Sequence, residues 1–320
     1  MRHGSRLLTL LAAVVLAGGQ VVLTAAPASA AVRSCSTSTP VAQRPTLRLH
    51  DSGSCVVVAQ KALVSKGYSV GAAGADGDFG NATLRAARAF QKEFGLDADG
   101  VVGPLTWAKL GTGAAYNRGR GPNTTSRVVA TFDDCPPSVA VFRAMVEAAD
   151  TAGVGLVLAP TGTCLTKYRN QGVDLAALAR SHGQYVINHT VSHPDLTTIS
   201  YASVLTQLAA PGVVTNVGRP PYGASDTTVA TAYTAAGMRQ WTWTLDTRDW
   251  TGKTAAEVVS YVVTNARAGD TVLMHMGWNA FTPKALTQIR AGLEARGLAL
   301  CAAYDGTTPT RLPRSLPCTG

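Results

Sequence analysis

From Arg127 onward, short apolar segments typical of β-strands alternate with longer segments of helical periodicity. Strands are predicted at 128–132, 154–159, 184–188, 213–217, 239–245, 271–275 and 298–302. Helices are predicted between them, at 138–152, 174–182, 201–209, 226–237, 255–268 and 283–296. This alternation predicts an α/β fold with parallel strands, either a barrel or an open sheet. In both folds, functional side chains gather at the carboxyl ends of the strands.

The first 30 residues are predicted to be a secretory signal peptide and not part of the fold. Arg2 and Arg6 precede an apolar run, and residues 28–30 (Ala-Ser-Ala) have the small side chains of a cleavage site. Residues 18–20 (Gly-Gly-Gln) interrupt the run, which leaves it too short for a membrane anchor. We therefore expect a secreted protein, extracellular or associated with the cell wall, with no membrane attachment after cleavage.

The chain has 6 cysteines, all outside the predicted signal peptide. An even number in an exported chain indicates disulfides, although sequence alone leaves many pairings open. The order of the cysteines suggests the pairs Cys35–Cys55, Cys135–Cys164 and Cys301–Cys318. Their spacing does not resemble that of a zinc cluster.

Two segments rich in small and polar residues, 31–45 and 111–126, are predicted to be linkers. The segment between them, 46–110, has helical periodicity. It contains a short repeat, Asp-Gly-x-x-Gly-x-x-Thr, at 76–83 and again at 99–106. Each copy is predicted to be a turn that starts a helix, and Pro104 suits the first helical position.

Segment 46–110 resembles the peptidoglycan-binding type 1 domain, a small all-α fold of three helices. The matching residues are Leu47-Arg48, Gln60-x-x-Leu63, Lys66-Gly67-Tyr68, both copies of the repeat, Phe90-Gln91 and Trp107. Because most of these are core or turn residues, they argue for the fold more than for a ligand. The resemblance implies binding to cell-wall glycan or peptide, and the alternative is a helical spacer.

Acidic and histidine side chains follow two of the predicted strands. Asp133 and Asp134 end the first strand, and His189 and His193 follow the third. Taken alone, the acidic pair would be a turn or helix cap, and the histidine pair would be structural. One carboxylate with two histidines is a common ligand set for a catalytic zinc that keeps an open position for water.

Three further strands end in polar or aromatic residues. Arg219-Pro220-Pro221-Tyr222-Gly223 follows the fourth strand, Asp246-x-x-Asp249-Trp250 follows the fifth, and Leu273-x-His275 ends the sixth. Each group has a structural explanation when taken alone: a surface ion pair, a core tryptophan, a buried histidine. Their occurrence at successive strand ends is difficult to explain in that way.

These groups together resemble the polysaccharide deacetylase family, the NodB-homology domain of carbohydrate esterase family 4. The resemblance covers 127–304, leaves 305–320 as a C-terminal tail, and implies a distorted (β/α) barrel. The sequence departs from the family pattern directly after the acidic pair, where Cys135-Pro136-Pro137 stands instead of Gly-Pro. A disulfide from Cys135 to Cys164 would tie two loops together beside the site.

The resemblance implies a site for one divalent metal, zinc first, with cobalt or nickel as alternatives. Asp134, His189 and His193 would hold the ion, which would activate a water molecule and polarise the acetyl carbonyl. Asp133 would be the general base, and Arg219 would orient it.

The resemblance also implies which residues act as acid, stabilise the oxyanion and contact the substrate. His275 would protonate the departing amine, and Asp246 would hold His275. The backbone N–H of Tyr222 would stabilise the oxyanion. The substrate-contacting residues would be Trp250, Pro221, Tyr222 and Asp249.

We therefore expect a secreted, metal-dependent polysaccharide N-deacetylase, a monomer, that acts on GlcNAc residues of peptidoglycan or of chitin-type glycans. The alternatives are an acetylxylan esterase of the same family and a non-catalytic cell-wall-binding protein. No nucleic-acid partner is expected. The chain has 28 Lys and Arg against 19 Asp and Glu, but two Arg leave with the signal peptide, and most of the remaining excess lies outside the two predicted domains.

Overall fold

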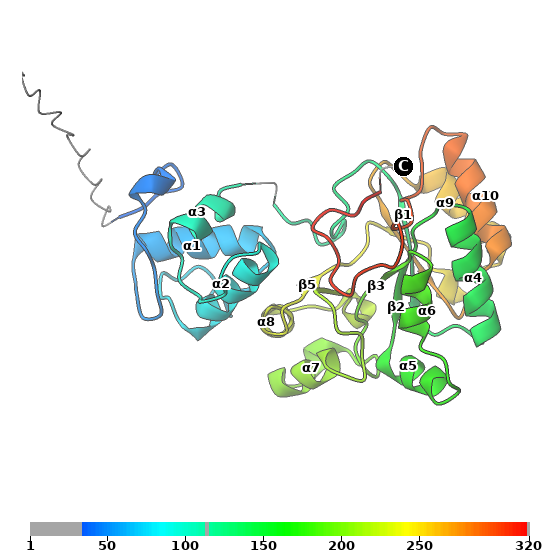
Figure 1. Ribbon diagram of the computed structural model, residues 1–320, viewed down its shortest axis with the longest axis horizontal. Helices are drawn as coiled ribbons and strands as arrows, with labels where there is room; N and C mark the ends of the chain where they lie inside the picture. The colour runs from blue at the N-terminus through cyan, green and yellow to red at the C-terminus, as the bar shows by residue number, and fades with distance from the viewer. Residues whose placement is uncertain (1–33, 113–114, 319–320) are drawn as a thin grey trace, which may run out of the picture. The chain divides into compact units, whose positions relative to one another are not determined.

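The structure is a computed structural model that describes residues 34–112 and 115–318 (Figure 1). The predicted signal peptide lies outside the described residues. Within the described ranges, no helix has both the length and the apolar character needed to cross a bilayer.

The N-terminal domain is built from three helices, as predicted. They are α1 (Ser54–Ser65), α2 (Asn81–Glu93) and α3 (Pro104–Leu110), with a short 3-10 helix η1 (Val41–Gln43) before them. Their apolar faces enclose Leu63, Phe90 and Trp107, which are fully buried. Pro104 occupies the first turn of α3, where the missing N–H costs no hydrogen bond.

Each copy of the repeat in this domain folds around a buried glutamine. In the first copy, Gln60 Nε2 donates to Asp76 Oδ1 at 2.8 Å and to Thr83 Oγ1 at 3.0 Å. The other end of the same amide, Oε1, accepts from the Gly77 N–H at 2.9 Å. Gln91 makes the equivalent bonds within the second copy. Each copy of the repeat is therefore a turn that is held together by a buried glutamine of the preceding helix.

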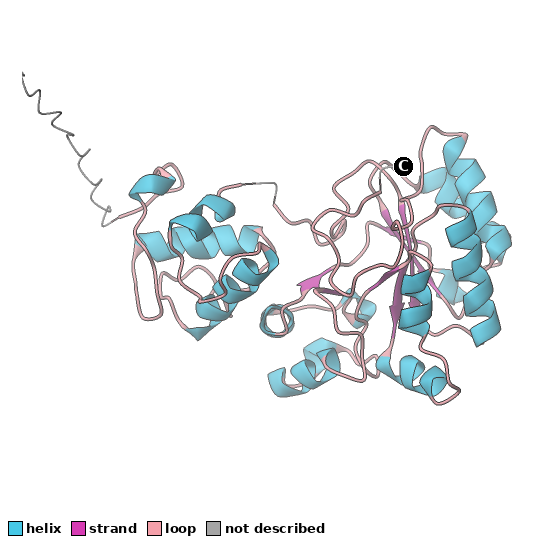
Figure 2. Cartoon of the chain, in the orientation of Figure 1, coloured by secondary structure: helices cyan, strands magenta, loops and turns pink. Residues whose placement is uncertain are grey.

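The α/β domain contains parallel strands and the helices that connect them (Figure 2). The strands are β1 (Val129–Asp134), β2 (Val157–Pro160), β3 (Tyr185–Val186), β4 (Val217–Gly218), β5 (Arg239–Gln240), β6 (Leu245–Asp246) and β7 (Thr271–His275). One sheet has the order β3-β2-β1-β7-β6, and β4 pairs with β5. A bridge between Asn188 and Gly218 continues the wall from β3 to β4, as expected for a distorted barrel.

The connecting helices are α4 (Val139–Thr151), α5 (Gly162–Arg169), α6 (Leu175–Ser181), α7 (Tyr201–Leu208), α8 (Thr227–Ala235), α9 (Ala255–Asn265) and α10 (Pro283–Glu294). Three short 3-10 helices lie in the loops: η2 (Leu196–Thr198), η3 (Pro221–Gly223) and η4 (Asp249–Thr251). In Figure 1, α4, α9 and α10 lie together along one side of the strands.

Alternation along β1 separates the core from the site. Ala130 and Phe132 point into the apolar layer beneath the helices, whereas Val129 belongs to a second apolar cluster on the other face. Since successive side chains of a strand point to opposite faces, Thr131 and Asp133 share the face of Val129. The carboxyl end of β1 thus carries Asp133 on the inner face of the wall.

Four elements differ from the sequence-based predictions. Of the predicted strand 213–217, only Val217 lies in a strand, the short β4. The predicted strand 239–245 is split into β5 and β6 by residues 241–244. The predicted strand 298–302 is no strand, because its only ladder contacts are single bridges to Val128 and Val154. Helix α5 was not predicted. It is short, and its start depends on the N-cap Thr161, whose side chain accepts from the Cys164 N–H.

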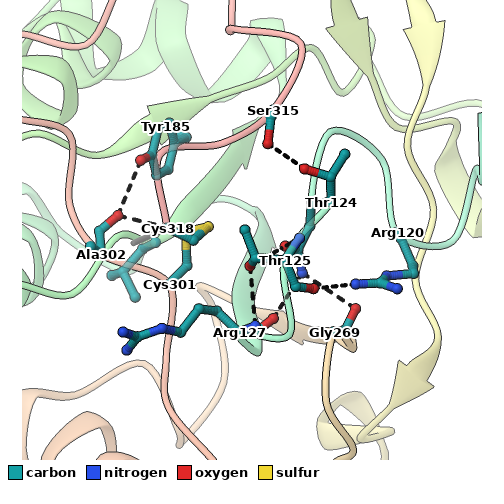
Figure 3. The surroundings of a disulfide bond; sticks show 12 residues. Arg120, Thr124, Thr125, Arg127, Tyr185, Gly269, Cys301, Ala302, Ser315 and Cys318 are labelled. Atoms are coloured by element: carbon teal, nitrogen blue, oxygen red, sulfur yellow. Dashed lines mark hydrogen bonds between the residues drawn. A yellow bond between two sulfur atoms is a disulfide. The ribbon is translucent and has the colours of Figure 1, made fainter. Parts of the chain in front are cut away.

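All three predicted disulfides are present: Cys35–Cys55, Cys135–Cys164 and Cys301–Cys318. The last one fastens the C-terminal tail to the α/β domain (Figure 3). Beside it, the Leu316 N–H donates to the Pro122 carbonyl at 3.0 Å, and Ser315 bonds to Thr124. The tail and the second half of the predicted linker 111–126 are therefore bonded to each other.

Candidate active site

A buried ion pair lies at the carboxyl end of β1. Arg219 is fully buried and lies 2.5 Å from Asp133 Oδ1 through its Nη1. The same nitrogen donates to Thr131 Oγ1, and Nε donates to the Trp241 carbonyl. Because the guanidinium is held at several points, it fixes the orientation of the Asp133 carboxylate.

The three predicted metal ligands lie together at the same strand ends. One ligand atom from each of Asp134, His189 and His193 lies within 4.8 Å of the other two. Both imidazole Nε2 atoms are 3.5 Å from Asp134 Oδ1. The ligand set therefore converges on one point, as the sequence predicted.

The second nitrogen of His189 explains why this group fits a metal ion. His189 Nδ1 lies 2.8 Å from the Arg219 carbonyl, which can only accept, so Nδ1 carries the proton. The other ring nitrogen, Nε2, therefore faces Asp134 and is the atom that could bind a metal ion. A backbone acceptor behind the ring is the usual support of a metal-binding histidine. The residues present therefore fit a divalent ion of the zinc type.

Electrostatics at this point also favours a cation. Burial opposes the charged form of His189, but the carboxylates of Asp133 and Asp134 raise its pKa. Burial likewise opposes ionisation of Asp134, but the nearby imidazoles lower its pKa. Burial and the neighbouring His189 lower the pKa of His193. Positive charge is thus stabilised between the carboxylates and kept off the outer histidine.

The backbone at the site is left-handed at several residues other than glycine. Positive φ angles occur at Asp134 (73°), Thr190 (63°), His193 (60°) and Tyr222 (59°). Such backbone costs about 1–3 kcal/mol per residue and persists only where the surroundings impose it. The chain turns sharply after β1 and after β3, which aims Asp134 and His193 at the same point.

His275 stands beside Asp133 on the neighbouring strand, since the two residues are partners in the β1–β7 register. Its predicted contact with Asp246 is wrong. The partner is Asp249, whose Oδ1 is 2.7 Å from His275 Nδ1 and whose Oδ2 accepts from the His275 N–H at 2.8 Å. Burial opposes protonation, but this contact and Asp133 raise the pKa of His275.

The exchange of roles has a local cause. Arg248 has left-handed backbone (φ 52°), and this turn brings the next residue, Asp249, beneath the ring of His275. Asp249 is fully buried, so it does not reach the substrate face where it was predicted. Asp246 accepts from the Arg248 N–H and remains half-buried at the wall of the cavity.

A cavity of about 500 Å³ opens above these side chains. Its lining includes the predicted residues Asp133, Asp134, His189, His193, Tyr222, Asp246, Trp250 and His275. Pro221 is buried and, like Arg219 and Asp249, supports the wall from behind.

Two tryptophans of the lining, Trp243 and Trp278, were not predicted because no motif marks them. Trp250 and Trp278 remain 51% and 40% exposed. The candidate catalytic groups therefore share their cavity with exposed aromatic rings.

Residues 120–241 match the family model of polysaccharide deacetylases, and residues 52–110 match that of a peptidoglycan binding domain. Residues 120–241 are therefore similar to polysaccharide deacetylases. The region that matches the deacetylase model contains the acidic pair, both candidate histidine ligands and Arg219.

The curated proteins that this chain is similar to have names that point to different substrates. A bifunctional xylanase/xylan deacetylase of Cellvibrio japonicus is 32% identical over 191 residues, which are 56% of this chain but only 27% of that protein. A chitooligosaccharide deacetylase of Azorhizobium caulinodans is 28% identical over 201 residues, 55% of this chain and 91% of that protein. Among solved structures, a family 4 carbohydrate esterase from Streptomyces lividans in complex with acetate has a TM-score of 0.49 at 24% identity, over 56% of this chain and 98% of that one.

Proposed function

We propose that this protein is a secreted, metal-dependent deacetylase that hydrolyses the acetamido groups of GlcNAc residues in cell-wall glycan. The products are acetate and a glucosamine unit with a free amine. One observation carries the proposal. A base candidate fixed by a buried arginine, a convergent metal ligand set and an acid candidate supported by a buried carboxylate all line one cavity.

Asp134, His189 and His193 are the proposed ligands of a divalent ion. Such an ion, when bound, activates a water molecule and polarises the acetyl carbonyl. Asp133 takes the proton of the attacking water. Arg219 fixes Oδ1 of this base, and the other oxygen, Oδ2, lies 3.6 Å from His189 Nε2, on the side of the ligands.

His275 is the proposed acid that protonates the departing nitrogen. Its Nδ1 is engaged by Asp249, so Nε2 is the atom that faces the cavity and delivers the proton. Asp249 keeps the ring protonated, which suits an amide, because an amine leaves readily only after its nitrogen has been protonated. The Tyr222 backbone N–H is proposed to donate to the oxyanion.

The helical domain supports a cell-wall substrate. Its family is described as peptidoglycan binding, and it is joined to the deacetylase domain in one chain. A binding domain raises the local concentration of a polymer at a linked active site. Peptidoglycan is therefore the first proposed substrate and chitin-type glycans the second. The disulfides and the absence of a membrane-spanning helix in the described residues are compatible with an extracellular enzyme.

A second candidate substrate is acetylated xylan, because the xylan deacetylase of Cellvibrio japonicus is 32% identical over its matched region. The chemistry differs only in the leaving atom, which is oxygen in the ester and nitrogen in the amide. Both reactions would use the same base and the same metal ligands.

The test is acetate release, measured in parallel on peptidoglycan, chitooligosaccharides and acetylxylan with zinc or cobalt present. We expect Asp133→Asn to lower kcat by about 100- to 10,000-fold while zinc binding persists. Asp305→Asn, a change at an exposed carboxylate of the C-terminal tail, is the matched control and should leave kcat unchanged. If the wild-type protein releases no acetate from any of these glycans, the proposal fails.

A further inference from the structure

Helix α5, which sequence analysis missed, lies between the two chain segments that carry the metal ligands. One segment is the end of β1 with Asp134, and the other is the loop from His189 to His193. Helix α5 contacts both segments through residues that are not themselves ligands. These contacts bear on how firmly the ligand set is held.

The first turn of α5 is bonded to the histidine loop. The Gly162 N–H donates to the Thr190 carbonyl at 2.9 Å, and the Thr163 N–H donates to the Val191 carbonyl at 2.8 Å. The Thr163 hydroxyl donates to the same Val191 carbonyl at 2.9 Å. A Cβ at Gly162 would lie 3.0 Å from the Val191 Cα, so only glycine permits this approach without displacing the loop. Both acceptors lie between the two histidine ligands.

The same helix is bonded to the acidic segment. Cys135 directly follows Asp134 and forms a disulfide with Cys164 of α5. One turn later, the buried Tyr168 donates its hydroxyl hydrogen to the Pro136 carbonyl at 2.7 Å. Helix α5 thus joins the carboxylate ligand to the histidine loop through one covalent bond and several hydrogen bonds.

This connection is placed where the backbone is strained. Asp134, Thr190 and His193 have left-handed φ angles, and such angles relax unless neighbouring structure holds them. Two of these residues are ligands, and the third accepts a bond from α5. Loss of the connection would release strain by moving the ligands apart, which lowers the affinity of a site that needs all three in register.

We propose that the Cys135–Cys164 disulfide and the first turn of α5 form a bracket that sets the metal affinity of the Asp134–His189–His193 site. The bracket residues are positioning residues: they touch neither metal nor substrate and act through the ligands. The inference rests on the proposed function only in taking these three side chains as metal ligands.

The test measures metal binding without substrate. Zinc affinity of the purified full chain is determined by competition with a chromophoric chelator, and the cobalt-loaded protein supplies a visible spectrum that reports ligand geometry. For the double variant Cys135→Ser/Cys164→Ser we expect about 10- to 100-fold weaker zinc binding and altered cobalt bands. Serine is chosen because a free thiol would itself bind zinc.

The matched control is Cys301→Ser/Cys318→Ser, which removes a cross-link of the same domain away from the site. Both double variants should lose thermal stability, but the control should keep the zinc affinity and cobalt spectrum of the wild type. Equal losses of affinity in the two variants would show a general stability effect and overturn the bracket. So would wild-type affinity in Cys135→Ser/Cys164→Ser.

Two gentler variants keep the proposal testable if the double variant fails to fold. Tyr168→Phe removes one hydrogen bond on the acidic side, and Thr163→Val removes one on the histidine side. Each should weaken zinc binding several-fold, and unchanged affinity in both would overturn the bracket. If wild type binds zinc tightly and loses affinity in these variants but releases no acetate, the bracket stands and the proposed function falls.

Discussion

The two domains place their characteristic polar side chains in different surroundings. In the helical domain, Gln60 and Gln91 are almost fully buried, and both ends of each amide are bonded inside their own turn. In the α/β domain, Asp134 and His193 are partly exposed, and their polar atoms lie 3.5 Å apart at the wall of a cavity. Polar groups that satisfy each other stabilise a fold, whereas groups that converge at a cavity are available to a ligand.

In the sequence, both the repeat of the helical domain and the strand-end residues of the α/β domain could indicate a binding site, and this difference distinguishes them. In the helical domain, the repeat forms turns that are stabilised by buried glutamines. The strand-end residues of the α/β domain form a site because parallel strands bring their carboxyl ends to the same edge. Four substitutions would break or sharpen this comparison, in decreasing order of expected effect.

The largest effect is expected for His275→Ala. Without the proposed acid, kcat for an N-acetyl substrate should fall by about 100- to 10,000-fold. Hydrolysis of an aryl acetate should fall much less, because that leaving group needs no proton. His182→Ala, which alters a histidine paired with Asp150 away from the cavity, is the control and should change neither rate. Equal losses on both substrates would argue against an acid role.

A smaller effect is expected for Asp249→Asn, with about a 10- to 100-fold lower kcat. Asp249 raises the pKa of His275 against the effect of burial, and the acid must be protonated to act. Removing this charge lowers that pKa, so the high-pH limb of the kcat profile should move to lower pH. Asp246→Asn is the matched control and should leave the limb in place. A shift in Asp246→Asn alone would restore the sequence-based assignment.

In the helical domain, Gln60→Leu should cost about 2 kcal/mol of unfolding free energy, because the Gly77 N–H and the Asp76 and Thr83 side chains lose their partner. Gln91→Leu should cost a similar amount, since its contacts are equivalent. Acetate release from a short chitooligosaccharide should stay at the wild-type rate. Chemical denaturation measures the loss of unfolding free energy, and the acetate assay measures kcat. A lower kcat with unchanged stability would contradict the structural role of the two glutamines.

The smallest effect is expected at the rim of the cavity. Trp278→Ala removes an exposed ring from the lining and should raise KM for an oligosaccharide about fivefold, equivalent to about 1 kcal/mol, with kcat unchanged. Val214→Ala, at an exposed apolar side chain that is not part of the cavity lining, serves as control. An unchanged KM in Trp278→Ala would remove this ring from the substrate site.

Much of the site could be predicted from sequence because functional side chains gather at the carboxyl ends of parallel strands in any strand order. Whatever the neighbours of β1, the ends of parallel strands meet at one edge, so Asp134 and His189 were expected to approach each other. The distinction between Asp246 and Asp249 could not be predicted, because both follow β6. It depends on the left-handed backbone of Arg248, which no residue type in the segment requires.

The positions of helix α5 and Trp278 at the site could not be predicted either, because no sequence motif marks them. Helix α5 is short, and its large apolar side chains, Leu165 and Tyr168, are too few to show a helical period. The one sequence signal for this helix was its N-cap residue, Thr161. Trp278 follows His275 by three residues in a loop, and its position at the cavity depends on the fold of that loop.

The connectivity of the disulfides bears on how such a chain could be exported. Each bond joins successive cysteines, with separations of 20, 29 and 17 residues, so no loop encloses a cysteine of another pair. In a chain that leaves a translocation channel with its N-terminus first, every cysteine meets its own partner before the next pair emerges. Oxidation in order of appearance then yields the native pairing, with no mispaired bond to be reshuffled by an isomerase.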